Sequence, residues 1–216
     1  MAVILSNLNR TVAAGLVLAA LLLAAVIIVG GADVGAILGG RTTWAYLFVW
    51  FHVLSGVMWI GHLYYFNFTQ MMVMPKIPAE LKPAVGKYIA PEALWWFRWA
   101  AMSTIITGLI VSWLRDYIFQ ALTFGIVAGP LDPNAACFIG VGMWLGAIMW
   151  FNVWFIIWPN QQKALNINNA YPNLTQAEKD KAARLAMLFS RTNTMLSIPM
   201  LLAMTGGGIN YGNSGL

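Results

Sequence analysis

Five long apolar runs constrain the fold of this 216-residue chain more than any other feature of its sequence. Each is close to the roughly 20 helical residues that cross about 30 Å of hydrocarbon. The runs are residues 11–30, 43–68, 91–113, 135–158 and 180–204. Charged residues make up only 9% of the chain and hydrophobic residues 60%, which excludes an ordinary soluble globule. The sequence therefore predicts an all-α integral membrane protein, a bundle of five transmembrane helices in contact with the lipid bilayer.

Local signals predict where several of these helices begin or end. Pro91 suits the first turn of the third span. Pro159 is expected to end the fourth span, because proline lacks the backbone N–H that a helix needs. Thr175 and Glu178 have the spacing of a capping box, which predicts the start of the fifth helix.

One apolar stretch is too short to be a span. Residues 117–128 provide only 12 residues and are expected to form a short interfacial or re-entrant helix. Residues 74–90, with three prolines, are expected to be a connector between the second and third spans. The sequence shows no internal repeat, so a single domain over residues 1–216 is expected.

The basic residues near the span ends predict the orientation of the bundle. With the N-terminus inside, eight Lys and Arg face the cytoplasm and two face outward, as the positive-inside rule requires. The inner set is Arg10, Lys76, Lys82, Lys87, Lys163, Lys179, Lys181 and Arg184, and the outer set is Arg41 and Arg115. The C-terminal tail is then outside, which is the periplasm if the protein belongs to a bacterial inner membrane. The scattered cations form no basic stripe, which argues against a nucleic-acid partner.

Both histidines of the chain lie on the second predicted span. His52 falls close to mid-membrane, and Gly56 and Trp59 share its helical face. Because Gly56 leaves room for a flat macrocycle, His52 is a candidate axial ligand of a haem. The alternative is a histidine that is hydrogen-bonded to a neighbouring helix.

His62 follows ten residues later, about 15 Å along the helix and about 80° around it. The two histidines therefore cannot ligate the same iron. One possibility is that the two histidines bind two separate haems. Otherwise His52 shares its haem iron with a Met or with a histidine of another chain, or the sixth coordination position of that iron is open. The alternative for His62 is an interfacial histidine without a ligand. No Cys-x-x-Cys-His motif is present, so covalent haem attachment is excluded.

Two arginines lie at the inner margins of the third and fifth spans. Arg98 and Arg191 either make hydrogen bonds between helices or pair with a propionate or another anionic group. In the fourth span, Gly142 and Gly146 have the small-xxx-small spacing that lets helices approach closely.

The residues around the histidines resemble those of a known family. The stretch FHVLSGVMWIGH, residues 51–62, resembles a signature of the membrane domain of bacterial urate hydroxylases, the urate oxidase N-terminal family. Residues 93–99, 152–163 and 191–200 are similar to the same family. The His-x3-Gly-x2-Trp pattern is also distantly similar to the haem-b-binding membrane protoporphyrinogen oxidases.

The resemblance implies a membrane redox protein that binds haem b, as an oxidoreductase or an electron-transfer subunit. The family is associated with oxidation of urate to 5-hydroxyisourate, and its members often carry a cytochrome c domain outside the membrane. By this resemblance His52 is the axial ligand, and His62 is a second ligand or a proton relay. Arg98 and Arg191 would hold anionic groups. Since this sequence shows no cytochrome domain, the expected electron acceptor is a separate periplasmic cytochrome c.

A function of a different class remains open. The chain is alternatively a non-catalytic subunit of a larger membrane complex, a homo- or hetero-oligomer in which the histidines only join helices. The Gly142 and Gly146 spacing favours such helix contacts. A transporter is less favoured, because no inverted repeat is visible.

Overall fold

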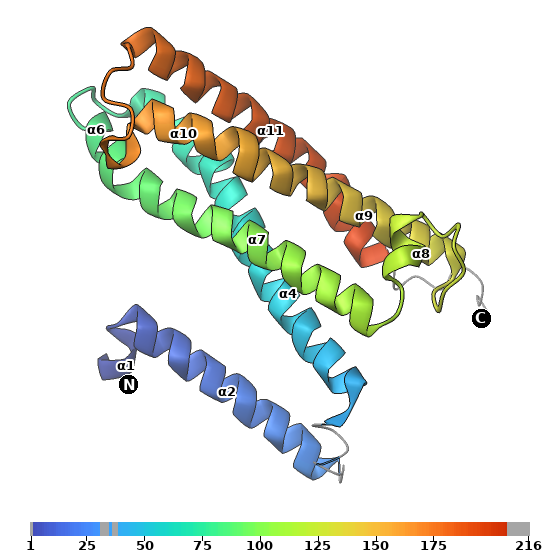
Figure 1. Ribbon diagram of the computed structural model, residues 1–216. Helices are drawn as coiled ribbons and strands as arrows, with labels where there is room; N and C mark the ends of the chain where they lie inside the picture. Colours follow the sequence, from blue (N-terminus) through green and yellow to red (C-terminus); the bar gives the residue numbers. More distant parts are fainter. Residues whose placement is uncertain (1, 31–34, 36–38, 207–216) are drawn as a thin grey trace. The chain divides into compact units, whose positions relative to one another are not determined.

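The computed structural model describes residues 2–30, 35 and 39–206, and every regular element in them is a helix (Figure 1). The all-α prediction is confirmed. The chain divides into two compact units, Met1–Trp44 and Ala45–Leu216, which are described separately. The C-terminal tail is predicted to lie on the outer side of the membrane. Its residues 207–216 are outside the described residues.

The first unit contains α1 (Ala2–Leu5) and α2 (Leu8–Val29). Asn7 caps α2, because its side-chain oxygen accepts a hydrogen bond of 3.2 Å from the backbone N–H of Arg10. No residue of α2 is buried within the protein. An apolar helix that buries nothing in protein and whose charged residue, Arg10, lies in its first turn is suited to a lipid environment.

The second unit consists of four long helical stretches. The first contains α4 (Arg41–Tyr64), the π-turn η1 (Tyr65–Gln70), α5 (Met71–Val73) and η2 (Met74–Lys76). The second contains α6 (Lys82–Ala84), η3 (Val85–Ile89) and α7 (Ala90–Leu114), and the short α8 (Ile118–Leu122) follows it. The third contains α9 (Pro133–Phe151), the π-turn η4 (Asn152–Ile157) and α10 (Trp158–Leu165). After η5 (Ile167–Asn169), α11 (Gln176–Gly206) completes the unit.

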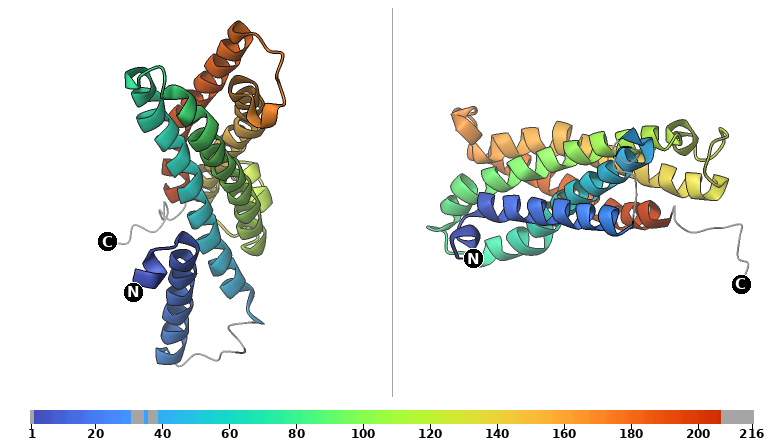
Figure 2. Two further views of the ribbon diagram at one scale, coloured as in Figure 1. Left: turned by 90° about the vertical axis from the view of Figure 1, so that its left-hand side faces the viewer. Right: turned by 90° about the horizontal axis from the view of Figure 1, so that it is seen from below.

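These stretches pack side by side in the second unit. α7 lies beside α9 and η4, and α11 lies beside α9 and α10 (Figures 1 and 2). Gly142 lets α11 approach closely, because a Cβ atom at this position would lie 3.2 Å from the Met204 side chain. Figure 1 places α6, the end of α10 and the start of α11 at one end of the unit, and α8 at the other. The first of these ends holds the predicted inner lysines Lys76, Lys82, Lys87, Lys163 and Lys179.

Four helical stretches of the described residues are long and apolar enough to cross a membrane. They are Leu8–Val29, Arg41–Lys76, Lys82–Leu114 and Pro133–Leu165. The predicted fifth span corresponds to α11. With 31 residues this helix is long enough to cross a membrane, but it is less apolar than the four stretches named above. Its polar residues Ser190, Asn193 and Ser197 are buried against neighbouring helices. The count of five spans and their orientation stay predictions.

Pro159 does not end the fourth span, so that prediction is wrong. The helical stretch continues through α10 to Leu165. The π-turn η4 lies directly before the proline, and the Trp158 N–H bonds back five residues to the Val153 carbonyl. This wider turn moves the preceding carbonyls away from the proline ring and so relieves the clash that interrupts an α-helix.

Two predicted lengths also differ from the structure. The interfacial helix expected over 117–128 is only the five-residue α8. The chain turns soon after it, at Phe124 and Gly125, which have positive φ angles of 56° and 81°. The expected connector 74–90 is helical from Lys82 onward, so the third span begins before Pro91.

The capping box at the start of α11 is confirmed. The Glu178 carboxylate accepts hydrogen bonds from the Thr175 backbone N–H at 2.8 Å and from its hydroxyl at 2.7 Å. In return, the Glu178 backbone N–H donates to Thr175 Oγ1 at 3.3 Å. Because the Thr175 bonds favour the ionised form, they hold the pKa of the Glu178 carboxyl below its ordinary value of 4.5.

Replacing Thr175 with Ala should raise the pKa of Glu178 back toward 4.5, because the hydroxyl donor is lost. The folded-state pKa of Glu178 is depressed, so the contribution of the capping box is present above pH 4.5 and is lost as the pH falls through the folded pKa. Carbon-detected NMR titration of the Glu178 carboxyl measures this directly. An identical midpoint in the wild type and in Thr175→Ala would contradict the assignment.

Polar side chains on α11 form a buried seam against the neighbouring helices, defined by Ser190, Asn193 and Ser197. Asn193 donates from Nδ2 to the Met149 carbonyl at 2.9 Å and accepts at Oδ1 from Asn152 Nδ2 at 2.8 Å. The other two members bond to the α4–η1 stretch. Asn67 Nδ2 donates to Ser190 Oγ at 2.8 Å, and the hydroxyls of Tyr64 and Ser197 lie 3.0 Å apart. In a bilayer, where water does not compete, such bonds hold helices in register.

Asn193→Ala is expected to destabilise the protein by about 1–2 kcal/mol, because it leaves the Met149 carbonyl and the Asn152 amide without their partner. Thr192→Val is the matched control, since the Thr192 hydroxyl bonds only to the Leu188 carbonyl of its own helix. Reversible unfolding in mixed detergent micelles measures both. Equal effects of the two changes would show that the seam contributes nothing specific.

Candidate functional site

His52 lies on α4 with its ring held against α7. Its Nδ1 is 2.9 Å from the Thr104 carbonyl oxygen and 3.3 Å from Thr107 Oγ1. A carbonyl can only accept, so Nδ1 carries the proton and donates to Thr104. Neutral His52 therefore has an unprotonated Nε2, for which no hydrogen-bond partner is found among the described residues. This nitrogen is available as a ligand or an acceptor.

Two glycines determine the space around His52. A Cβ atom on Gly108 of α7 would lie 2.9 Å from His52 Cε1, so only glycine lets the ring sit where it does. A Cβ atom on Gly56, one turn after His52, would meet nothing within 4 Å. The expectation that Gly56 leaves open space on this part of α4 agrees with the structure.

Trp59 belongs to the protein core. It is 1% exposed, and its indole Nε1 has no hydrogen-bond partner among the described residues. The indole N–H groups of Trp150 and Trp154 are buried without a partner among the described residues as well, and a water or a ligand group can satisfy such a donor. The expected helical face of His52, Gly56 and Trp59 thus combines one free acceptor, one open position and one unpaired donor.

Gly108→Ala should displace the His52 ring and cost about 1–3 kcal/mol of stability, because the added methyl group overlaps the ring. Gly56→Ala is the matched control. It should be neutral or stabilise the protein by up to about 1 kcal/mol, since alanine favours helix and its methyl group meets nothing. Nitrogen NMR of the imidazole reports the Nδ1–H signal, which should change only in Gly108→Ala. An unchanged signal there would contradict the contact.

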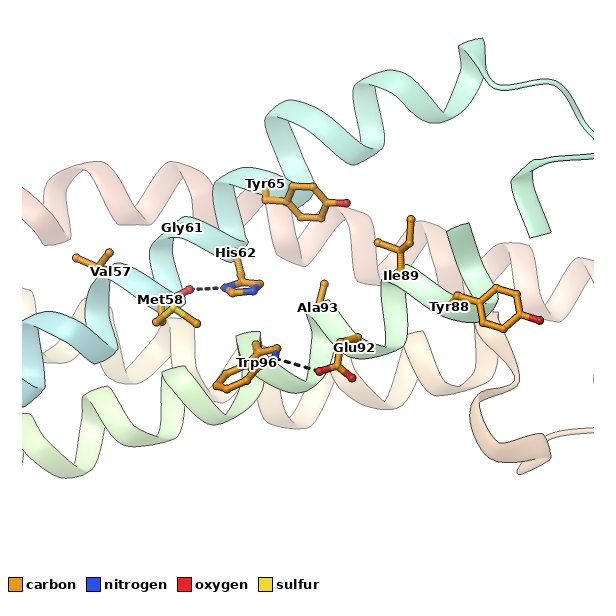
Figure 3. A pocket seen from close by; sticks show the side chains of 10 residues that line it. All are labelled: Val57, Met58, Gly61, His62, Tyr65, Tyr88, Ile89, Glu92, Ala93 and Trp96. Atoms are coloured by element: carbon orange, nitrogen blue, oxygen red, sulfur yellow. Dashed lines mark hydrogen bonds between the residues drawn. The ribbon is translucent and has the colours of Figure 1, made fainter. Parts of the chain in front are cut away.

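A second feature of this region is a groove of about 610 Å³ between the α4–η1 stretch and the η3–α7 stretch (Figure 3). We call it the α4–α7 groove. Half of its lining comes from α4 and η1 and half from η3 and α7. The first set is Val57, Met58, Gly61, His62 and Tyr65, and the second is Tyr88, Ile89, Glu92, Ala93 and Trp96. His62 therefore lines a groove that does not include His52.

Three polar side chains of the α4–α7 groove, those of His62, Glu92 and Trp96, form hydrogen bonds within their own helices (Figure 3). The Nδ1–H of His62 donates to the Met58 carbonyl at 2.7 Å, which leaves Nε2 as the unprotonated nitrogen of the neutral ring. Glu92 Oε1 accepts from the Trp96 indole N–H at 3.1 Å. Sequence reasoning named His62 but missed Glu92 and Trp96 as its neighbours, because the pairing depends on how α7 lies beside α4.

The two predicted arginines do not meet at His52. The Arg98 guanidinium carbon lies 3.7 Å from the centroid of the Trp158 ring and 5.1 Å from that of Trp154, so this side chain stacks on η4 and α10. Its Nε is buried without a partner among the described residues. Arg191 is exposed on α11. Their role in holding an anionic group stays a prediction.

Sequence reasoning also missed the α7 residues that hold His52. Thr104 and Thr107 fix its Nδ1, and Gly108 makes room for its ring. Ser103 adds a second link to α4, because its hydroxyl lies 2.7 Å from that of Ser55. A cluster of hydroxyl residues within an apolar span is a signal that could have identified this helix as the neighbour of His52.

The donor set at His52 suits a single axial bond to haem iron. Metal-bound histidines almost always donate the other ring N–H to a carbonyl or carboxylate, as His52 does to Thr104. Among the residues that the structure covers, no group of three His, Cys, Asp or Glu is placed to hold a metal ion. Haem iron needs no such group, because its porphyrin supplies four of the ligands.

Comparison with known proteins gives one family. Residues 124–211 match the urate oxidase N-terminal family. The resemblance predicted from the sequence is confirmed over these residues, which include the stretches 152–163 and 191–200. The matched urate oxidase N-terminal region covers less than half of the chain and does not contain His52 or His62. No curated protein and no solved structure gives a significant match. The distant likeness to protoporphyrinogen oxidases stays a prediction.

Proposed function

We propose that this protein is a haem-b-binding redox subunit of the bacterial inner membrane, with His52 as an axial ligand of the haem iron. The arrangement of His52 supports this proposal most directly. Its Nδ1 is fixed by the Thr104 carbonyl, its ring is seated against Gly108, and its Nε2 is left free. The match of residues 124–211 to the urate oxidase N-terminal family adds a redox context.

The residues around His52 would each have a distinct task. The hydrogen bond to Thr104 fixes the tautomer and makes Nε2 more basic, which strengthens a bond to iron. The open space at Gly56 would admit the edge of a macrocycle. Bound haem would supply one-electron chemistry. A second ligand to the iron would be a Met or a histidine of another chain, or the site would stay open, since His62 lies in the α4–α7 groove.

The electron acceptor in this proposal is a periplasmic cytochrome c. The lysines gathered at one end of the second unit support an orientation with that end in the cytoplasm. The end that carries α8 would then face the periplasm, where a soluble cytochrome has access. Arg98, with its unpaired Nε near the inner end of α7, would hold an anionic group such as a propionate.

A reduced-minus-oxidised visible spectrum of the purified protein tests the proposal. The wild type should show the α-band of a b-type haem, and His52→Ala should lose it because the axial ligand is gone. His62→Ala is the matched control, as the other histidine of the chain, and should keep the band. Gly56→Leu should also lower haem content while leaving Thr104 and its bond to His52 in place.

A wild-type protein without the band, or a band unchanged in His52→Ala, would overturn the haem proposal. The alternative favoured by the same hydrogen bond is a non-catalytic subunit of a larger membrane complex, because the His52–Thr104 bond also joins two helices. In that case His52→Ala should lower stability without changing any absorption, and native mass analysis should show the protein only in complex with other subunits.

A further inference from the structure

We propose that the α4–α7 groove binds a membrane-soluble quinol, a planar ring with two hydroxyl groups and an apolar tail. The inference concerns binding at His62 and Glu92 and does not depend on haem at His52. It rests on three properties of the groove: the hydrogen-bonding character of its polar groups, the nature of its walls and its charge.

Of the four titratable side chains that line the groove, His62 and Glu92 present acceptors, whereas the hydroxyls of Tyr65 and Tyr88 can donate or accept. The neutral His62 ring donates its Nδ1–H to the Met58 carbonyl, so its Nε2 can only accept a hydrogen bond. Glu92 receives the Trp96 indole N–H at Oε1, which leaves its second oxygen to accept another bond. A ligand that satisfies both must supply donors. A quinol supplies two hydroxyl groups, whereas the oxidised quinone carries only acceptors at the same positions.

The walls of the groove are apolar and aromatic. Val57 and Ile89 are both at least half exposed, and Trp96 offers the face of an indole ring. The lining comes from two stretches that are each long and apolar enough to span a membrane. A ligand dissolved in the lipid therefore reaches the groove sideways, without crossing water, and a planar ring gains stacking on aromatic side chains.

The charge of the groove argues against a phospholipid as the occupant. Its lining contains one carboxylate, that of Glu92, and no Lys or Arg. Lys87 lies outside the lining, with its ammonium 5.3 Å from the centroid of the Tyr88 ring. Phosphate groups are recognised by direct charge-assisted bonds from Arg or Lys, which this lining does not offer. A phospholipid phosphate would in addition be repelled by the Glu92 carboxylate, whereas an uncharged quinol is not repelled.

Glu92→Gln gives the sharpest test. The Trp96 N–H should retain the amide oxygen of the new glutamine, so that its NH₂ group faces the ligand and replaces an acceptor by a donor. Binding of the reduced ligand should weaken about tenfold, while binding of the oxidised quinone should not weaken. Glu80→Gln, the same change at an exposed glutamate outside the groove, should leave both affinities unchanged.

The measurement is equilibrium binding of radiolabelled decyl-ubiquinol and decyl-ubiquinone to the full chain in detergent, with and without dithionite. A second variant, Gly61→Phe, places an aromatic ring in the groove from a position where the added Cβ atom meets nothing within 4 Å. It should abolish binding while the protein elutes as the wild type does. The proposal would be overturned if the wild type showed no saturable binding of the quinol. It would also be overturned if Gly61→Phe bound the quinol with wild-type affinity, or if phosphatidylglycerol displaced the quinol. The haem spectrum is read separately and is unaffected by these outcomes.

Discussion

The bilayer core contains no water, and this absence governs how the polar groups of the chain are placed. A buried amide or hydroxyl is therefore stabilised by a partner on a neighbouring helix or on its own backbone, although Asn67 Oδ1 has none among the described residues. Asn193 shows the rule most clearly, because both ends of its amide are bonded to the α9–η4 stretch. The seam on α11 therefore holds this helix in register against its neighbours. The seam also lowers the hydropathy of α11, to which the charged residues near its start and Arg191 contribute as well.

The same requirement makes His52 informative. Its Nδ1 is bonded to Thr104, and no partner of its Nε2 is found among the described residues. The indole N–H of Trp59 is buried without a partner among the same residues, as are those of Trp150 and Trp154. Unpaired polar atoms inside a membrane are expensive and are kept where a ligand or a water satisfies them. The bond to Thr104 alone would serve to join two helices. The proposal of a ligand rests on the second nitrogen together with the open position at Gly56.

Fold and function draw on different parts of the chain. The match to the urate oxidase N-terminal family covers the region from α9 to α11, where packing and the polar seam are concentrated. Both histidines, the open position at Gly56 and the α4–α7 groove belong instead to α4, η1, η3 and α7. These two helical stretches carry two distinct sites, one with His52 against Thr104 and one with His62 beside Glu92. A redox role would use the first to hold a cofactor and the second to hold its lipid-soluble partner.

The sequence alone determined the helical class, the long apolar stretches and the capping box at Thr175, because these depend on neighbours within about one turn of helix. It also placed His52 and Gly56 on one helical face, which follows from a fixed 100° per residue. Only the tertiary structure decided that the helix continues past Pro159, through a π-turn that begins at Asn152, where the side chain bonds to Asn193 of α11. It also decided which α7 residues meet His52 and which meet His62. Contacts between helices depend on how two whole surfaces fit, and no local pattern contains that information.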